Sequence, residues 1–429
     1  MSSRDFILMT LVRGEMTKIR HSCLFVLLSA AALAQNAPTS LQSLITEARQ
    51  NNAAIKAAES ALQTTRYMPK QASALPDTEV MVQHFTVGSP RPFAGYSNSD
   101  FAYIGFGASQ ELPYPGKRAL RANVAQHEVA ISGAEKNSVA WDVLTRLKLA
   151  YFQLAASQQV ISVLERNQQA ADGIEQAAEA RYRVGEGMQQ DVLRAQLERT
   201  KLLNGLSMQR RESAQAQVVL KALLNRSQES SDLITEPLSA RRTPTAEALF
   251  AKLRQNNPEL QVSAEQVSQT RTAVELANRE KKPDFGVQYM WQHTADNFRD
   301  YYMGTFSIKF PNRSRVRAAE AEAKAKVTQA EAEKESRLKQ MESDLGEQLA
   351  IVQTSEQKLK VYEEGLIPQS EAALNAGLAG YRAGGKQEYQ GLLASFADTL
   401  QLSIDRERTL AEHEAAIARI EGLVGEELQ

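Results

Sequence analysis

Long blocks without proline constrain this chain more than any other feature. No proline occurs between Pro115 and Pro237, between Pro311 and Pro368, or after Pro368. Because a proline inside a helix costs ~3 kcal/mol, these blocks are free to form very long helices. They are also rich in Ala, Glu, Gln, Lys, Leu and Arg, which is the composition of coiled coils. A helix over 118–183 would be on the order of 100 Å long, which no compact globule needs.

The chain also repeats itself. Three short motifs recur in the same order at a separation of about 200 residues, which indicates a duplication. The paired motifs are 50–59 and 255–264, 112–118 and 308–314, and 181–187 and 380–386. We therefore expect two structural repeats, 35–240 and 241–429, each built as helix, two strands, long helix, tight turn and long helix. The first motif of each repeat is expected to open a helix of roughly thirty residues.

Four short segments alternate as strands do. In 284–293, Phe285, Val287, Tyr289 and Trp291 share one face while polar residues share the other, which is typical of a barrel wall around a wet lumen. Each segment is close to the ~9–11 residues of a tilted membrane strand. The first segment alternates poorly, so a soluble hairpin at the end of a coiled coil is the alternative. The four predicted strands are 78–88, 101–111, 284–293 and 301–310.

The N-terminus has the pattern of an export signal. A basic stretch after Met16 precedes the apolar run 24–33, and Ala32-Leu-Ala matches the small-x-small cleavage pattern. We expect 1–34 to be a signal peptide with a misassigned start before Met16. A membrane anchor is the alternative, but the run is shorter than the ~20 residues that span a bilayer. The only cysteine, Cys23, lies in this segment, so neither a disulfide nor a lipid anchor is expected.

Beyond this segment the sequence has no apolar stretch long enough for a membrane helix. Only helices and closed barrels satisfy every backbone group in lipid, so this chain would enter a membrane as strands. Four strands cannot close a barrel, and the apolar stripes of the helices also need partners. Several copies are therefore expected to combine.

At these motifs the chain resembles the TolC-like outer-membrane efflux family over nearly the whole mature sequence. The shared features are Asn-Asn before the repeated helix, a strand-to-helix corner, and a Tyr-x-x-Gly turn in a helical hairpin. The resemblance implies a mainly α fold with a small β part, in which coiled-coil hairpins form a periplasmic tube. It also implies a homotrimer whose chains each give four strands to a twelve-stranded transmembrane barrel.

The same resemblance implies a place and partners for the protein. The place is the outer membrane of a Gram-negative-type cell, with helices extending into the periplasm. The partners are outer-membrane lipid, a periplasmic adaptor (membrane fusion protein) and an inner-membrane transporter of the RND type. The corner 111–118 is similar to the branch that serves heavy-metal resistance pumps. The corner residues of the two repeats are Pro113, Pro115, Gly116 and Pro311.

The turns between long helices are expected to form the periplasmic tips that dock the adaptor. Their glycines allow the positive φ that a hairpin between antiparallel helices needs; the alternative is that they only break helices. The residues of the two tips are Tyr182, Arg183, Val184, Gly185, Gly187, Tyr381, Arg382, Gly384 and Gly385.

Charges beside the tips are the candidates for an entrance or gate. Some family members place aspartates one and two turns after the second tip, but those positions hold Gln390 and Leu393 here. Asp191, after the first tip, fits the family pattern, and Lys386 and Glu388 are the other nearby charges. A ring of such residues around an axis would set ion preference, although solvated helix charges are the commoner outcome.

The sequence carries no sign of catalysis. It has no phosphate-binding glycine loop, no H-E-x-x-H and no paired-cysteine zinc pattern. The 50 basic and 51 acidic residues give a net charge of −1, which is no argument for nucleic acid. We expect no enzyme activity, no cofactor and no metal site.

The leading interpretation is a passive exit duct in a tripartite efflux pump, for heavy-metal cations or drugs. The alternatives are the outer duct of a type I protein-secretion system and a non-channel periplasmic coiled-coil scaffold. Aromatic residues on the strand faces favour membrane insertion over the scaffold.

Overall fold

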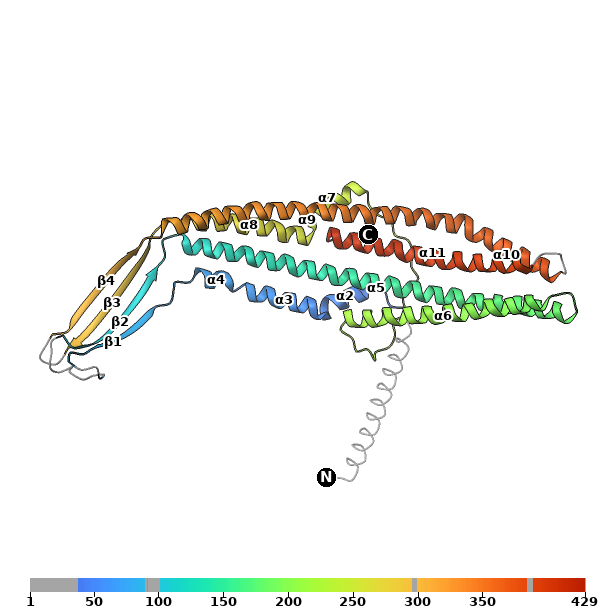
Figure 1. The fold of residues 1–429 in the computed structure, drawn as a ribbon, viewed down its shortest axis with the longest axis horizontal. Helices are drawn as coiled ribbons and strands as arrows, with labels where there is room; N and C mark the ends of the chain where they lie inside the picture. The colour runs from blue at the N-terminus through green and yellow to red at the C-terminus, as the bar shows by residue number, and fades with distance from the viewer. Residues whose placement is uncertain (1–37, 89–90, 92–100, 295–298, 384–388, 429) are drawn as a thin grey trace, which may run out of the picture.

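The computed structural model describes residues 38–88, 91, 101–294, 299–383 and 389–428. The expected signal peptide lies outside these residues. A long layered bundle of helices carries a four-stranded sheet at one end, and helical hairpins form the other end (Figure 1). This is the predicted fold class, mainly α with a small β part.

The two halves of the chain repeat one order of elements. The first half contains α2 (Leu41–Asn51), α3 (Ala53–Thr65), α4 (Met68–Ser73), β1 (Glu79–Phe85), β2 (Tyr103–Leu112), α5 (Lys117–Arg183) and α6 (Gln189–Leu223). The second contains α7 (Ala246–Asn256), α8 (Pro258–Arg279), β3 (Asp284–Thr294), β4 (Tyr301–Lys309), α9 (Arg313–Val361), the π-helical turn η3 (Tyr362–Leu366), α10 (Ile367–Arg382) and α11 (Tyr389–Val424). Each half thus has helices, two strands and then long helices in the same order, and the turn between α10 and α11 lies outside the described residues.

The opening of each half differs from the prediction. Each begins with a short helix, which stops at Asn52 or Asn257 in an extended conformation with ψ of 130° or 124°. Each asparagine then caps the next helix, since its side-chain oxygen accepts from Ile55 N or Leu260 N. The roughly thirty-residue helices are therefore wrong: α3 has 13 residues and α8 has 22. Prolines in the segments that follow favour these early ends.

The sheet joins the two halves. Its strand order is β1-β2-β3-β4 with antiparallel pairing throughout, so the central pair β2 and β3 comes from different halves. Phe106 lies opposite Trp291, and their rings stack with centroids 5.9 Å apart. On the same face Phe285 stacks on Phe306 with the same separation. The predicted apolar face is thus confirmed. The opposite face is not wholly polar, because Met81, Met290 and Met303 lie in one row across it. Strand β1 is shorter than predicted.

The helices beside the sheet form one layer in the order α9, α8, α5, then α3 and α4 (Figure 1). Toward the tips, α5 packs against α6 and α11. Buried leucines and alanines of α5, α6 and α11 form much of the core there. The packing is close because small residues such as Ala155, Ala178 and Ala195 occupy buried positions.

A buried ionic cluster ties the middle of the bundle together. Lys148 Nζ lies 2.7 Å from Glu421 Oε2, and both side chains are less than 5% exposed. Arg241, in the link between the halves, donates to Glu421 at 2.9 Å and to Glu414 at 2.6 Å. These bonds join α5, the link and α11, which are far apart in sequence.

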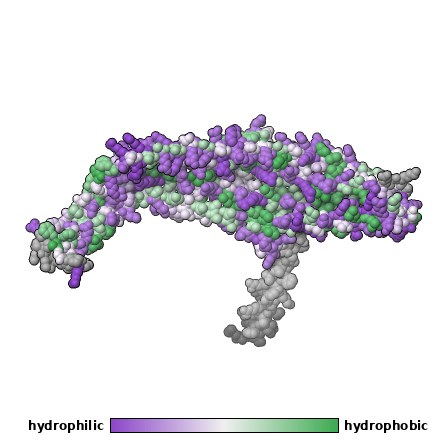
Figure 2. All heavy atoms as spheres, in the orientation of Figure 1, coloured by the Kyte–Doolittle hydropathy of each residue, from purple (hydrophilic) through white to green (hydrophobic). Residues whose placement is uncertain are grey.

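None of the helices in the described part of the chain is long and apolar enough to cross a membrane. Hydrophobic side chains gather instead along the strands, as Figure 2 shows at the sheet end of the molecule. Val82, Tyr302, Phe306 and Phe310 are each more than 60% exposed. The described residues therefore leave the apolar sheet face without cover.

Candidate functional site

The first tip is a closed helical turn between α5 and α6. Gly185 has φ of +77°, Gly185 N donates to Tyr182 O at 3.1 Å, and Glu186 N donates to Arg181 O at 2.9 Å. This pair of bonds is the Schellman motif, in which a left-handed residue satisfies the last carbonyls of a helix. The predicted positive φ is confirmed at Gly185.

Gly187 serves the same tip in another way. Its φ is not positive, so the positive φ expected there is wrong. A side chain on Gly187 would place Cβ 3.0 Å from Tyr182 N and 3.1 Å from Arg181 Cβ. The glycine is needed because the chain passes close to the end of α5.

The surface of this tip is apolar. Tyr182, Val184 and Met188 are 48%, 70% and 69% exposed, and Leu193 and Leu197 continue the exposed stripe one and two turns into α6. Exposed apolar groups that lie together mark surfaces for protein contact. Arg183 is also exposed, with its guanidinium 3.8 Å from Glu179.

The second tip begins where α10 ends at Arg382, and Ala383 N donates to Ala379 O at 3.0 Å. Gly384, Gly385, Lys386 and Glu388 lie outside the described residues. Tyr381, the equivalent of Tyr182, is buried, with 3% exposure. Equivalent tyrosines of the two repeats therefore face opposite environments.

Arg181 connects the two tips. The Arg181 guanidinium lies 4.7 Å from the centre of the Tyr381 ring, and Arg181 Nη1 donates to Tyr381 O at 3.3 Å. The Tyr381 ring in turn packs on Tyr389 with centroids 5.1 Å apart. A cation over an aromatic face is attracted by the ring quadrupole, so this stack holds the end of α5 against α10 and α11.

Two of the entrance candidates, Asp191 and Gln390, are among the described residues. Asp191 lies in the first turn of α6, where the helix dipole favours a carboxylate. Burial raises the pKa of Tyr381, and the Asp191 charge raises it further. Burial likewise raises the pKa of Tyr389. Both phenols are therefore neutral beside the carboxylate at physiological pH.

Gln390 is paired rather than free. With its amide in the orientation that satisfies both groups, its oxygen accepts from Arg194 Nη1 at 2.6 Å. This bond connects α11 to α6 near the second tip. The structure thus brings Asp191 close to the tyrosine stack and Gln390 to Arg194.

The strand-to-helix corners use different caps in the two repeats. Gly116, with φ of +92°, precedes α5, and a Cβ there would lie 3.2 Å from the Arg279 guanidinium. In the second repeat Asn312 follows Pro311 and accepts from Ser314 N and Arg315 N. Pro113 and Pro115 precede Gly116 and keep the corner out of the helix.

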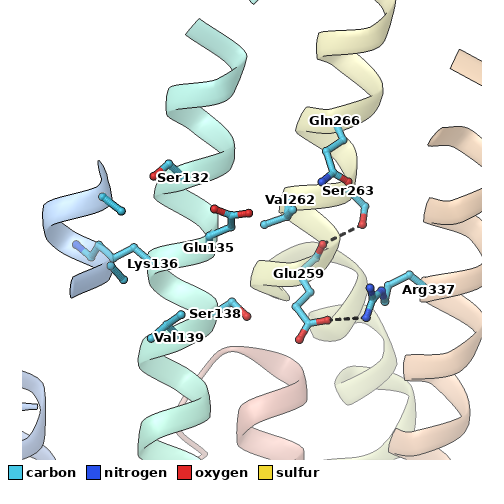
Figure 3. A pocket seen from close by; sticks show the side chains of 12 residues that line it. Ser132, Glu135, Lys136, Ser138, Val139, Glu259, Val262, Ser263, Gln266 and Arg337 are labelled. Carbon is cyan, nitrogen blue, oxygen red and sulfur yellow. Dashed lines mark hydrogen bonds and ion pairs between the residues drawn. The ribbon is translucent and has the colours of Figure 1, made fainter. Parts of the chain in front are cut away.

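Several grooves lie between the helices, and one of them is shown in Figure 3. It has a volume of about 440 Å³ and lies between α3, α5, α8 and α9. Glu259 on α8 reaches across to Arg337 on α9 at 3.2 Å, while Glu135 and Val262 line the space between α5 and α8. No group of three His, Cys, Asp or Glu among the described residues is placed to hold a metal ion. The groove is a seam between packed helices and offers no catalytic arrangement.

Sequence comparison finds one family match. Residues 44–226 match the model of the family described as outer membrane efflux protein. This part of the chain is therefore similar to that family. The match covers the repeat that contains the first tip and the Gly116 corner. No curated protein matches the chain.

Solved outer membrane proteins share the fold over both repeats. VceC of Vibrio cholerae is 17% identical, with a TM-score of 0.76 over 91% of this chain and 97% of that one. The Neisseria gonorrhoeae MtrE outer membrane channel, in an open state, is 17% identical, with a TM-score of 0.75 over 91% and 89% of the two chains. The Campylobacter jejuni CmeC outer membrane channel is 12% identical, with a TM-score of 0.74 over 90% and 85%. The efflux-family match of residues 44–226 agrees with the expectation that the chain is not an enzyme.

Three residues at the tips and at the first strand-to-helix corner were not predicted from sequence. Arg181 and Tyr389 flank the Tyr-x-x-Gly signature but are not part of it, and Lys117 looks like an ordinary basic residue at a helix start. The one available signal was the repeat itself: Arg181 aligns with Gly380, so the two tips cannot be equivalent.

Proposed function

We propose that this protein is the outer-membrane subunit of an efflux pump, and that it acts as a passive exit duct. The observation that carries the proposal is the combination of an efflux-family match with a sheet whose apolar face is exposed. A strand face that alternates aromatic and aliphatic residues suits lipid contact, while the opposite polar face suits water. In this proposal three copies combine their sheets into one barrel in the outer membrane of a Gram-negative-type cell.

The helical end is the part that would meet the rest of the pump. The apolar tip formed by Tyr182, Val184 and Met188 supports docking to a periplasmic adaptor, because such patches are unusual on free surfaces. The adaptor would connect the duct to an inner-membrane transporter of the RND type, which supplies the energy. At the second tip the exposed Arg382 would add to this docking surface, whereas Tyr381 is buried.

The two repeats, 35–240 and 241–429, act in this proposal as one duplicated unit after removal of the signal peptide 1–34. The candidate substrates are heavy-metal cations and drugs, and the heavy-metal candidate comes from the similarity of the corner 111–118 to the branch that serves heavy-metal resistance pumps. A duct for secreted proteins is the second candidate function, since the same fold would serve it.

Reconstitution tests the duct directly. The protein, extracted from outer membranes and added to planar lipid bilayers, is expected to give discrete conductance steps. A second measurement is the retention of a periplasmic adaptor by immobilised protein, compared with the Val184→Asp variant. Absence of conductance from protein that inserts in the bilayer would reject the duct, and unchanged adaptor retention by the variant would reject the tip assignment.

A further inference from the structure

The strand-to-helix corner of the first repeat contains a buried lysine with a full set of partners. Lys117 is 1% exposed, and its Nζ lies 2.9 Å from Asp284 Oδ1, 3.0 Å from Glu280 Oε2 and 2.9 Å from Lys282 O. Asp284 Oδ1 also accepts from Tyr114 N at 2.8 Å. These partners all belong to the second repeat, so the contact locks α5 of one repeat to α8 and β3 of the other.

The second repeat has an equivalent basic residue and the first an equivalent aspartate, but these two residues do not form the ion pair with each other. Arg313 takes the place of Lys117, because the motif 112–118 recurs as 308–314. Asp77 takes the place of Asp284, because Pro76-Asp77 opens the first hairpin as Pro283-Asp284 opens the second. Arg313 and Asp77 are both exposed, and within the described residues neither forms an ion pair.

The order of the helices and strands explains why Arg313 and Asp77 lie apart. In the layer, α5 packs between α8 and the α3 and α4 pair, whereas α9 has α8 on one side only. Figure 1 shows α9 and α3 at opposite edges of this layer, with β4 and β1 at opposite edges of the sheet. Arg313 and Asp77 therefore lie at opposite edges of the layer, whereas the equivalent pair of Lys117 and Asp284 lies in its interior.

We propose that Arg313 forms with Asp77 of a second copy of this chain the ion pair that Lys117 forms with Asp284 within one chain. This rests on the proposed function, which requires several copies in one ring. The charges are complementary. An arginine suits a joint between chains because its planar guanidinium binds a carboxylate with two parallel hydrogen bonds.

The same repeat fixes how the open strands meet. Leu112 lies opposite Phe285 in the joint between β2 and β3. Aligning Ile308 with Leu112, and Asp77 with Asp284, places Ile308 opposite Thr78 of the second copy, and Gly304 opposite Val82 of that copy. The strands run antiparallel, and Gly304 and Val82 both lie on the apolar face. A shift by one residue would turn that face to the wrong side.

Charge reversal tests the ion pair in the full chain, extracted in detergent. Asp77→Arg and Arg313→Asp are each expected to lower the association constant of the oligomer about tenfold, and the double variant is expected to recover most of it. Arg337→Asp is the matched control, because Arg337 pairs with Glu259 within the chain and its reversal should leave association unchanged. Equal losses in the single and double variants, or no loss in either, would overturn the contact.

Cysteine pairing tests the register. In a Cys23→Ser background, Val82→Cys with Gly304→Cys is expected to give covalent oligomers on oxidation, since directly opposed Cβ atoms lie about 4.5–5.5 Å apart. Val82→Cys with Tyr302→Cys, displaced by two residues, is expected to give far less. A higher yield of covalent oligomers from the displaced pair, in an oligomer of unchanged mass, would overturn the register without contradicting the proposed duct. A single chain in native mass measurements would overturn both.

Discussion

The side-chain amide of Asn52 donates a hydrogen bond to the carbonyl oxygen of Leu223 at 2.8 Å, across 171 positions of sequence. The second repeat contains the same bond, in which Asn257 donates to Leu423 O at 2.7 Å. Each asparagine also caps the helix that follows it. One side chain therefore fixes the start of a helix and the end of the last helix in its own repeat.

This relationship predicts the effect of losing either asparagine. Asn52→Ala or Asn257→Ala removes the cap, which costs ~0.5–2 kcal/mol, and leaves a carbonyl without its donor. We expect the midpoint of thermal unfolding to fall in both variants. Asn51→Ala is the control, because Asn51 is exposed and its loss should change little. Equal midpoints for Asn51→Ala and Asn52→Ala would contradict the role of the bond.

Arg181 is predicted to hold the two tips together. Arg181→Ala removes both the stacking on Tyr381 and the hydrogen bond to its carbonyl. We expect faster proteolysis of the tips and a larger conductance in reconstituted channels. Arg183→Ala serves as control, since the Arg183 side chain is 74% exposed. Identical proteolysis rates for the two variants would show that the stack does not restrain the tips.

Removing one partner of the buried ion pair between Lys148 and Glu421 is predicted to lower the free energy of unfolding strongly. Lys148→Ala leaves Glu421 buried with fewer partners, and breaking a buried pair in this way typically costs ~3–5 kcal/mol. Lys201→Ala removes an exposed pair with Glu198, which is expected to cost ~0–1 kcal/mol. Denaturant midpoints of the two variants measure the difference. A Lys148→Ala midpoint as high as that of Lys201→Ala would contradict the prediction.

Glu320 gives the helices near the sheet a defined pH dependence. Hydrogen bonds from Lys281 and Lys324 lower the pKa of this carboxyl from 4.5 to about 2. Because the pKa is lower in the folded chain, the stabilisation is present above pH 4.5 and is lost as the pH falls toward 2. Glu320→Gln should therefore unfold more easily than the parent at pH 7, and the difference should shrink near pH 2. A stability difference between Glu320→Gln and the parent that is constant over this pH range would refute the predicted pH dependence.

Sequence alone was sufficient for the parts of the fold that depend on periodicity and on absent prolines. The helix α5 matches the prediction because nothing in that block breaks it, and β3 and β4 match because Phe285, Trp291 and Phe306 alternate with polar residues. The breaks at Asn52 and Asn257 were missed, since an asparagine in a helical pattern shows its extended conformation only when its tertiary partner is known.

The tips show the same limit. Gly185 was predicted because the left-handed position of a helix end strongly prefers glycine. The burial of Tyr381 and exposure of Tyr182 could not be predicted, because both occupy the same motif and differ only in their neighbours. Likewise, Lys117 and Arg313 look alike in sequence, and only the layer order shows that one is enclosed and the other is at an open edge.

The native mass of the protein, extracted from outer membranes in a mild detergent, tests the central claim most directly. The account predicts a complex of three chains, because the described part of one chain supplies a four-stranded sheet with two open edges and an exposed apolar face, and the proposed duct is a trimer. A single chain that carries its sheet alone would contradict the shared barrel, the exit duct and the contact between Arg313 and Asp77 together.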